Sequence, residues 1–361
     1  MNAVLEAPAV RVYLGPNWFA AVMGTGIVAN AAATVPLHLP GLRLAATFVW
    51  ALAATLLLAL STAWAVHLRR HRATALGYAA DPVMAQFWGA PPMAAMTVGG
   101  GALLLGRDWL GTDLAVAVAG ALWLAGTVGG LVTAVAIPYL MMTRHEIGPD
   151  AAFGGWLMPV VPPMVSAANG ALLVPYLPPG QLRLDLVLAG YALFGISLFA
   201  TVVIVTQLWA RLVRQRVGPA RRVPTLWIVL GPLGQSITAA HLLGSAAAGV
   251  LPAPYGTGAQ VFALFYGLPA FGFALLWLAL AATITLRTHR SSGGLPFTPA
   301  WWSFVFPVGT LVTGATGLAA RSHAHVIAAL AVVLYVVLVA AWATTAIRTT
   351  QALSSDLRHS G

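Results

Sequence analysis

Long apolar stretches separated by short polar segments run through the whole chain of 361 residues. A spanning helix needs about 20 apolar residues to cross roughly 30 Å of hydrocarbon, and ten stretches approach or exceed that length. The pattern predicts an all-α membrane protein that forms a single transmembrane domain over residues 1–361. The ten spans are expected at 16–34, 42–66, 83–105, 114–141, 155–175, 184–210, 224–250, 258–286, 298–319 and 324–347.

A repeat marks every second span, because a tryptophan stands near the start of each odd-numbered one. These residues are Trp18, Trp88, Trp156, Trp227 and Trp302. One tryptophan at a membrane boundary is typical of the interfacial aromatic belt, but here a helix breaker follows in each repeat. We therefore expect five helical hairpins in a quasi-fivefold arrangement. The expected bends are at Gly24, Gly26, Pro92, Pro162, Pro232 and Pro307.

The odd-numbered spans combine these breakers with small polar residues, whereas the even-numbered spans are uniformly apolar. A proline inside a helix frees a carbonyl group, and at membrane depth such backbone must be packed in protein or line a wet cavity. We therefore expect five bent inner helices around a pore. The candidate lining residues are Thr25, Asn30, Thr97, Ser166, Asn169, Gln235, Ser236, Thr310 and Thr313, with Thr238 and Thr316 on the same spans.

Two alternatives remain open for these residues. Small polar side chains also join transmembrane helices to one another, so each Ser or Thr has a packing interpretation. His241 is the one ionisable residue well inside a predicted span. It is a candidate pH-sensing group, or a histidine hydrogen-bonded between helices. Phe306, directly before Pro307, could plug a narrow pore or simply pack in the core.

Composition and charge support a membrane protein and orient it. Apolar residues make up 60% of the chain and charged residues 7%, too few charges to cover a soluble surface. Most of the 18 basic residues, all arginine, lie in alternate connections, and only Arg43, Arg107, Arg183 and Arg321 lie in the others. The positive-inside rule then predicts both termini in the cytoplasm of a bacterium, with the chain in the inner (plasma) membrane. Because the arginines lie between apolar spans, the net charge of +10 does not indicate nucleic-acid binding.

Carboxylates are missing from the predicted spans, since all eight acidic residues lie in loops or at span ends. Proton pumps usually need an intramembrane carboxylate, so a proton pump is disfavoured. The chain also lacks cysteine, which excludes a thiolate metal site and thiol chemistry. We expect no cofactor, no metal and no enzymatic activity. Walls of amides and hydroxyls favour anions over cations, which need acidic rings or converging carbonyls. The hypotheses are a passive anion conduit, a gradient-driven efflux carrier for an organic acid, sulfite or a toxic oxyanion, and, least favoured, an integral membrane enzyme.

Two segments resemble a known family. GPNWFAAVMGTGIVANA in the first span and WWSFVFPVGT in the ninth are similar to the tellurite-resistance/dicarboxylate transporter family, which includes plant slow-type anion channels and fungal malate and sulfite transporters. The resemblance implies a homotrimer in the lipid bilayer with one pore in each protomer. It also implies a gate at Phe306 and passage of small inorganic anions or C4-dicarboxylates.

Overall fold

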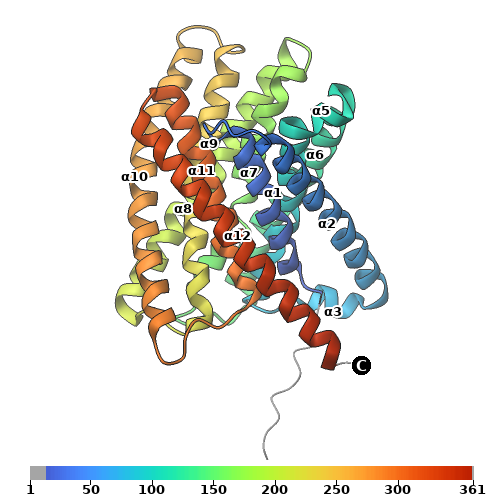
Figure 1. Cartoon of the computed structure of the whole chain (residues 1–361), viewed down its shortest axis with the longest axis vertical. Helices are drawn as coiled ribbons and strands as arrows, with labels where there is room; N and C mark the ends of the chain where they lie inside the picture. Colours follow the sequence, from blue (N-terminus) through green and yellow to red (C-terminus); the bar gives the residue numbers. More distant parts are fainter. Residues whose placement is uncertain (1–13, 360–361) are drawn as a thin grey trace, which may run out of the picture.

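The computed structural model describes residues 14–359, and it is all-helical over that range (Figure 1). The two termini, whose cytoplasmic location the arginine pattern predicts, end in residues 1–13 and 360–361, outside the described residues. The main helices are α1 (Phe19–Thr34), α2 (Leu42–Arg70), α4 (Ala90–Gly101), α6 (Thr112–Thr143), α7 (Pro162–Leu173), α8 (Gln181–Gln215), α9 (Leu230–Ala248), α10 (Tyr255–Arg290), α11 (Phe306–Ser322) and α12 (His325–His359). Two short helices, α3 (Arg72–Gly77) and α5 (Arg107–Leu110), lie in connections.

Seven helical segments of the described chain are long and apolar enough to cross a membrane. The protein is therefore a multi-pass membrane protein, as the hydropathy pattern predicts. The segments are Leu42–Arg70, Thr112–Thr143, Gln181–Gln215, Ala220–Ala248, Tyr255–Arg290, Pro299–Ser322 and His325–Ser355. The other three predicted spans contain α1, α4 and α7, which are only 16, 12 and 12 residues long.

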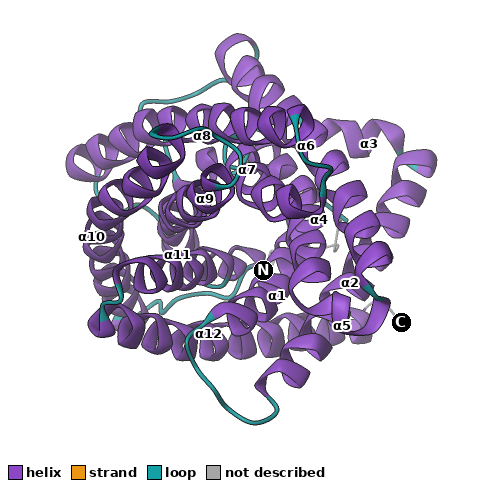
Figure 2. Cartoon of the chain, turned by 90° about the horizontal axis from the view of Figure 1, so that it is seen from above, coloured by secondary structure: helices purple, strands orange, loops and turns teal. Residues whose placement is uncertain are grey.

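Two sets of helices differ in burial. In the spanning windows that contain α9 and α11, 72% and 78% of residues are buried, compared with 22% to 33% in the five other windows. Figure 2 shows α1, α4, α7, α9 and α11 inside, with α2, α6, α8, α10 and α12 around them. The outer helices expose large apolar side chains such as Phe48, Phe199 and Phe265, which suits a surface covered by lipid.

Short 3-10 segments precede the inner helices, and this differs from the bends that the sequence predicts. Met84–Gly89, Gly154–Leu157, Ala220–Val229 and Pro299–Phe304 lead into α4, α7, α9 and α11. Pro92, Pro162, Pro232 and Pro307 then lie in the first turn of these α-helices. A first-turn proline costs no helical hydrogen bond, because its missing N–H has no partner there. The prolines therefore start helices instead of bending their middles.

The first inner helix, α1, runs unbroken through Gly24 and Gly26. Both glycines allow close packing. A Cβ atom on Gly24 would lie 2.6 Å from the Trp302 ring, and one on Gly26 would lie 2.8 Å from Thr97 Cγ2. Small residues in transmembrane helices commonly permit such close approach, so these positions are explained by packing between inner helices and not by a bend.

The beginning and the end of the described chain lie side by side. Helix α1 packs against α11 and α12 as well as α2 and α4. The indole Nε1 of Trp342 in α12 donates a hydrogen bond to Thr25 Oγ1 in α1, at 3.2 Å. These contacts complete the ring of helices seen in Figure 2.

Candidate functional site

A cavity of about 310 Å³ lies among the five inner helices. Each of α1, α4, α7, α9 and α11 contributes side chains to its wall, from the C-terminal part of the helix in most cases. The polar lining residues are Asn30, Thr34, Thr97, Asn169, Gln235, Thr238, His241, Thr313 and Thr316. All five inner helices therefore form the cavity, and its wall carries amide and hydroxyl groups.

The cavity wall carries no fixed charge. Within residues 14–355, whose side chains the structure describes, no Asp, Glu, Lys or Arg lines it. The amide and hydroxyl groups of this wall can donate hydrogen bonds to an anion. The protein does not have to bury a charged side chain there, which would be costly. The wall therefore offers neutral hydrogen-bonding groups to an occupant.

The amide side chains on the wall differ in how they are held. Asn30 Nδ2 donates to the Thr97 carbonyl oxygen at 3.0 Å, and Asn169 Nδ2 donates to the Val165 carbonyl oxygen at 2.9 Å. Gln235 is 5% exposed and makes no hydrogen bond within the part of the chain that the structure describes. Because the Gln235 amide has no protein partner among the described residues, it is available to an occupant of the cavity. A hydrogen bond from the occupant would remove the cost of leaving this amide unpaired.

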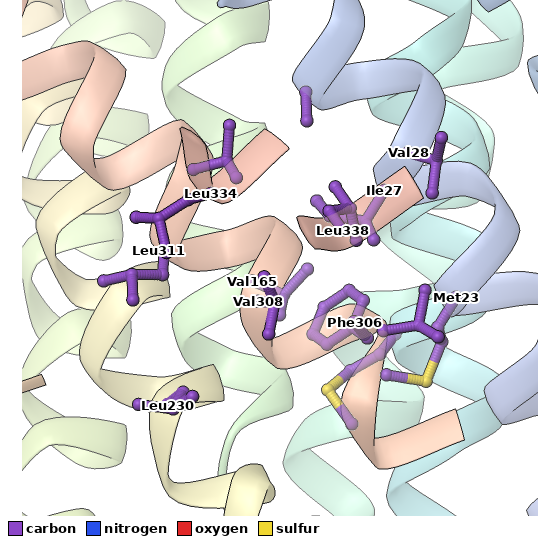
Figure 3. Packing of buried hydrophobic residues seen from close by; sticks show 14 of the residues in the cluster. Met23, Ile27, Val28, Val165, Leu230, Phe306, Val308, Leu311, Leu334 and Leu338 are labelled. Carbon is purple, nitrogen blue, oxygen red and sulfur yellow. The ribbon is translucent and has the colours of Figure 1, made fainter. Parts of the chain in front are cut away.

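Phe306 is part of the wall of this cavity. It also lines a second, smaller cavity of about 30 Å³, whose wall includes Met23, Met93, Met158 and Trp302. This second wall comes from the N-terminal parts of the inner helices and the 3-10 segments before them. Phe306 is 6% exposed, and Figure 3 shows its ring beside Met23 in the apolar cluster that includes Ile27. Phe306 thus belongs both to the wall of a polar chamber and to the wall of an apolar one.

Four predicted lining residues do not line the polar cavity, because their hydroxyls join helices instead. Thr25 Oγ1 accepts from Trp342, and Ser236 Oγ accepts from Tyr266 Oη at 2.7 Å. Ser166 Oγ is 2.6 Å from Thr127 Oγ1. Thr310 Oγ1 lies 3.2 Å from the Gly231 carbonyl oxygen of α9, besides its bond to the Pro307 carbonyl oxygen of its own helix. These residues fit the alternative interpretation, in which small polar groups hold transmembrane helices together.

The other predicted residues, Asn30, Thr97, Asn169, Gln235 and Thr313, lie together on the cavity wall with His241 and Phe306. The sequence pattern does not single out Thr34, although it also lines the cavity. Its signal is its spacing: residues four apart on a helix lie on the same face, and Thr34 follows Asn30 by four.

Arg321 stands at the end of α11, next to the cavity residue Ala320. Its Nη2 donates to the His241 carbonyl oxygen at 3.3 Å and to Ser245 Oγ at 2.9 Å. These bonds join the end of α11 to α9. His241 itself lies on the cavity wall, and a positive charge thus stands near its backbone.

Charge pairing is sparse outside the cavity. The one ion pair among the side chains of residues 14–355 joins Arg43 Nε and Asp108 Oδ2 at 2.6 Å. This hydrogen bond from Arg43 lowers the pKa of the Asp108 carboxyl, and its charge lowers the pKa further. The described residues contain no group of three or more His, Asp or Glu side chains placed to hold a metal ion.

The helical bundle and its polar chamber define a membrane transport protein, and sequence comparison identifies its family. Residues 13–350 match the voltage-dependent anion channel family, and the chain belongs to it. This match confirms the family that the two segments in the first and ninth predicted spans indicate.

Named relatives are transporters and efflux pumps. An uncharacterized transporter of Methanocaldococcus jannaschii is 28% identical, over 93% of this chain and 92% of its own length. A sulfite efflux pump of Arthroderma otae is 27% identical, over 91% of this chain and 87% of its own. A sulfite efflux pump of Candida albicans is 24% identical, over 82% of this chain and 64% of its own.

Proposed function

We propose that this protein passes small anions across the membrane through the centre of its five inner helices, with Phe306 as the gate. One observation carries the proposal: Phe306 borders both the polar cavity and the small apolar cavity beyond it. A side chain in that place controls whether the two chambers communicate. The proposed gating role rests on the position of the Phe306 ring between the two cavities, and not only on its being a phenylalanine.

The polar chamber supports anions as the substrate class. Gln235 has an unpartnered amide, and the wall of the chamber lacks carboxylates within the described residues. Small inorganic anions and C4-dicarboxylates fit this chemistry. His241 on the same wall is the candidate pH-sensing group, since a protonated imidazole would add a positive charge to the path.

The apolar chamber supports a gate. Met23, Met93 and Trp302 surround Phe306 on that side, and they offer an ion no replacement for its hydration shell. Apolar constrictions of this kind close a pore by excluding water. Movement of the Phe306 ring would widen the narrowest point.

For the arrangement in the membrane, we propose ten crossings by one domain over residues 1–361, as five hairpins in quasi-fivefold order. The alternation of buried and lipid-exposed helices supports this arrangement, with α1, α4 and α7 as the three additional crossings. We place both termini in the cytoplasm of a bacterium, with the bundle in the plasma membrane. The family resemblance supports a homotrimer with one pathway in each protomer.

A second candidate is a gradient-driven efflux carrier for sulfite, an organic acid or a tellurite-type oxyanion. The names of the fungal relatives favour it, because they are sulfite efflux pumps. Flux measurements distinguish an efflux carrier from a gated anion channel. A carrier saturates and responds to a pH gradient, whereas a channel gives single-channel current steps.

The test of the gate is Phe306→Ala in proteoliposomes, with chloride, nitrate and sulfite as probes. We expect anion flux to rise about tenfold, which corresponds to ~1.4 kcal/mol removed from the barrier. Phe304→Ala is the matched control, because Phe304 lies two residues away, contacts Trp227 and lines neither cavity. Equal flux in Phe306→Ala, Phe304→Ala and the unsubstituted protein would exclude the gate.

A further inference from the structure

Two grooves adjoin one another between α8 and α10, on the outer surface of the bundle. One has a volume of about 220 Å³ and an apolar wall that includes Trp209, Leu280 and Ile284. The other has a volume of about 730 Å³ and includes Arg214, Arg216 and Arg287. The two share Leu212, Val213, Val217 and Ile284, so together they form one continuous surface with an apolar end and a basic end.

The basic end lies where α8 ends and α10 ends, on the side of the chain that carries most of the arginines. None of Arg214, Arg216 and Arg287 has an acidic partner among the described residues, where the one ion pair is between Arg43 and Asp108. Thr288 and Ser291 add hydroxyl groups to the same groove. The groove therefore presents three uncompensated positive charges beside hydrogen-bonding groups.

The wall that carries Arg216 is fixed by the buried Arg211. Its Nη1 donates to the carbonyl oxygens of Arg216 and Val217, at 2.9 Å and 3.2 Å. Arg216 has φ = 64° and Gly218 has φ = 80°, a left-handed backbone that is uncommon for a residue other than glycine. Arg211 thus stabilises the sharp turn that brings Arg216 to the groove.

We propose that these grooves form a binding site for an anionic glycerophospholipid. Its phosphate would lie among Arg214, Arg216 and Arg287, and one acyl chain would lie along Leu212, Val213 and Ile284. Basic pockets between transmembrane helices on the cytoplasmic side suit anionic lipid headgroups. A free phosphate ion would fill only the basic end, whereas a lipid matches both ends at once.

The experiment is native mass spectrometry of the full-length protein in detergent, titrated with phosphatidylglycerol and with phosphatidylcholine of the same acyl chains. We expect several-fold stronger retention of phosphatidylglycerol. Arg214→Gln and Arg287→Gln should each weaken that retention about fivefold, from ~1 kcal/mol per arginine near anionic lipid. Arg69→Gln, an exposed arginine in the last turn of α2, is the matched control and should leave retention unchanged.

Two further measurements address the source of the phosphate and the role of the apolar end. Soluble glycerol phosphate should not displace phosphatidylglycerol, and Val213→Trp, which fills the apolar end at a lipid-exposed position, should lower retention. Equal retention of the two lipids by the unsubstituted protein would overturn the proposal. Displacement by glycerol phosphate at equal concentration would overturn it in favour of a free-phosphate site, and retention unaffected by both arginine substitutions would place the lipid elsewhere.

Discussion

The inner and outer helices both contain glycine, but the glycines lie in different surroundings. Inner helices bring glycine against neighbouring backbone: a Cβ on Gly234 of α9 would lie 2.4 Å from Leu311 N in α11. On the outer helix α8, a Cβ on Gly195 would meet no atom within 4 Å. The presence of glycine alone therefore does not separate these two environments. The difference teaches that the interior is specified by close packing and the exterior mainly by hydrophobicity.

The strongest challenge to this comparison is Gly234→Ala. We expect a loss of about 3 kcal/mol, because the new methyl group meets backbone atoms of α11 that cannot move aside. The measurement is the apparent melting temperature of the detergent-solubilised protein. Gly195→Ala is the matched control and should leave the melting temperature nearly unchanged. Similar melting temperatures for the two variants would contradict the packing difference.

Gln235→Leu tests whether the interior polar groups serve an occupant. We expect anion affinity to fall roughly tenfold, since a hydrogen bond to a charged group contributes about 1.5 kcal/mol or more. The measurement is the concentration dependence of anion flux. The control is Gln207→Leu, at an exposed position of the outer helix α8. If both variants keep the affinity of the unsubstituted protein, the Gln235 amide does not contact the anion.

Thr25→Val sharpens the distinction between lining and packing residues. The substitution removes the acceptor of the Trp342 Nε1 bond, so we expect stability to fall by about 1 kcal/mol with anion affinity unchanged. Thermal unfolding and flux should be measured together. Thr206→Val is the control, because the Thr206 hydroxyl bonds only to the Val202 carbonyl oxygen of its own helix. A change in anion affinity without a change in stability would move Thr25 to the lining set.

The smallest effect is expected at the Arg43–Asp108 pair. Both side chains are about half exposed, at 52% and 44%, so Asp108→Asn should cost below about 1 kcal/mol, and salt should reduce this cost further. Because the pair lowers the pKa of Asp108, its contribution is present above the carboxyl's unfolded pKa and is lost as pH falls through the lowered folded pKa. Melting temperatures at low and high salt check this. A large loss that is independent of salt would contradict it.

The sequence predicts the class, the family and the odd–even contrast between helices, because hydropathy and the tryptophan–proline repeat are visible in the order of residues. It does not predict where the α-helices begin. Pro92 and Pro307 mark the first turn after a 3-10 segment, and a proline at a helix start looks the same in sequence as one at a bend.

The sequence also does not show which face of each inner helix lines the cavity. Thr25 and Asn30 lie on α1, but at about 100° per residue their side chains point in directions roughly 140° apart. Only Asn30 lines the cavity. Gln235 and Ser236 are adjacent and separate in the same way, one toward the cavity and one toward Tyr266. Residue type identifies candidates, and helical phase decides among them.

The contact between α1 and α12 has a consequence for biosynthesis. Trp342 reaches Thr25 across 317 positions of the chain, so the outer layer of helices around α1 remains open on one side until the last helix has been translated and inserted. Until then, α1 lies in the bilayer without its contact to α12. Nascent chains that stop before α12 are therefore expected to be natural substrates for membrane quality-control proteases, whereas completed chains are protected.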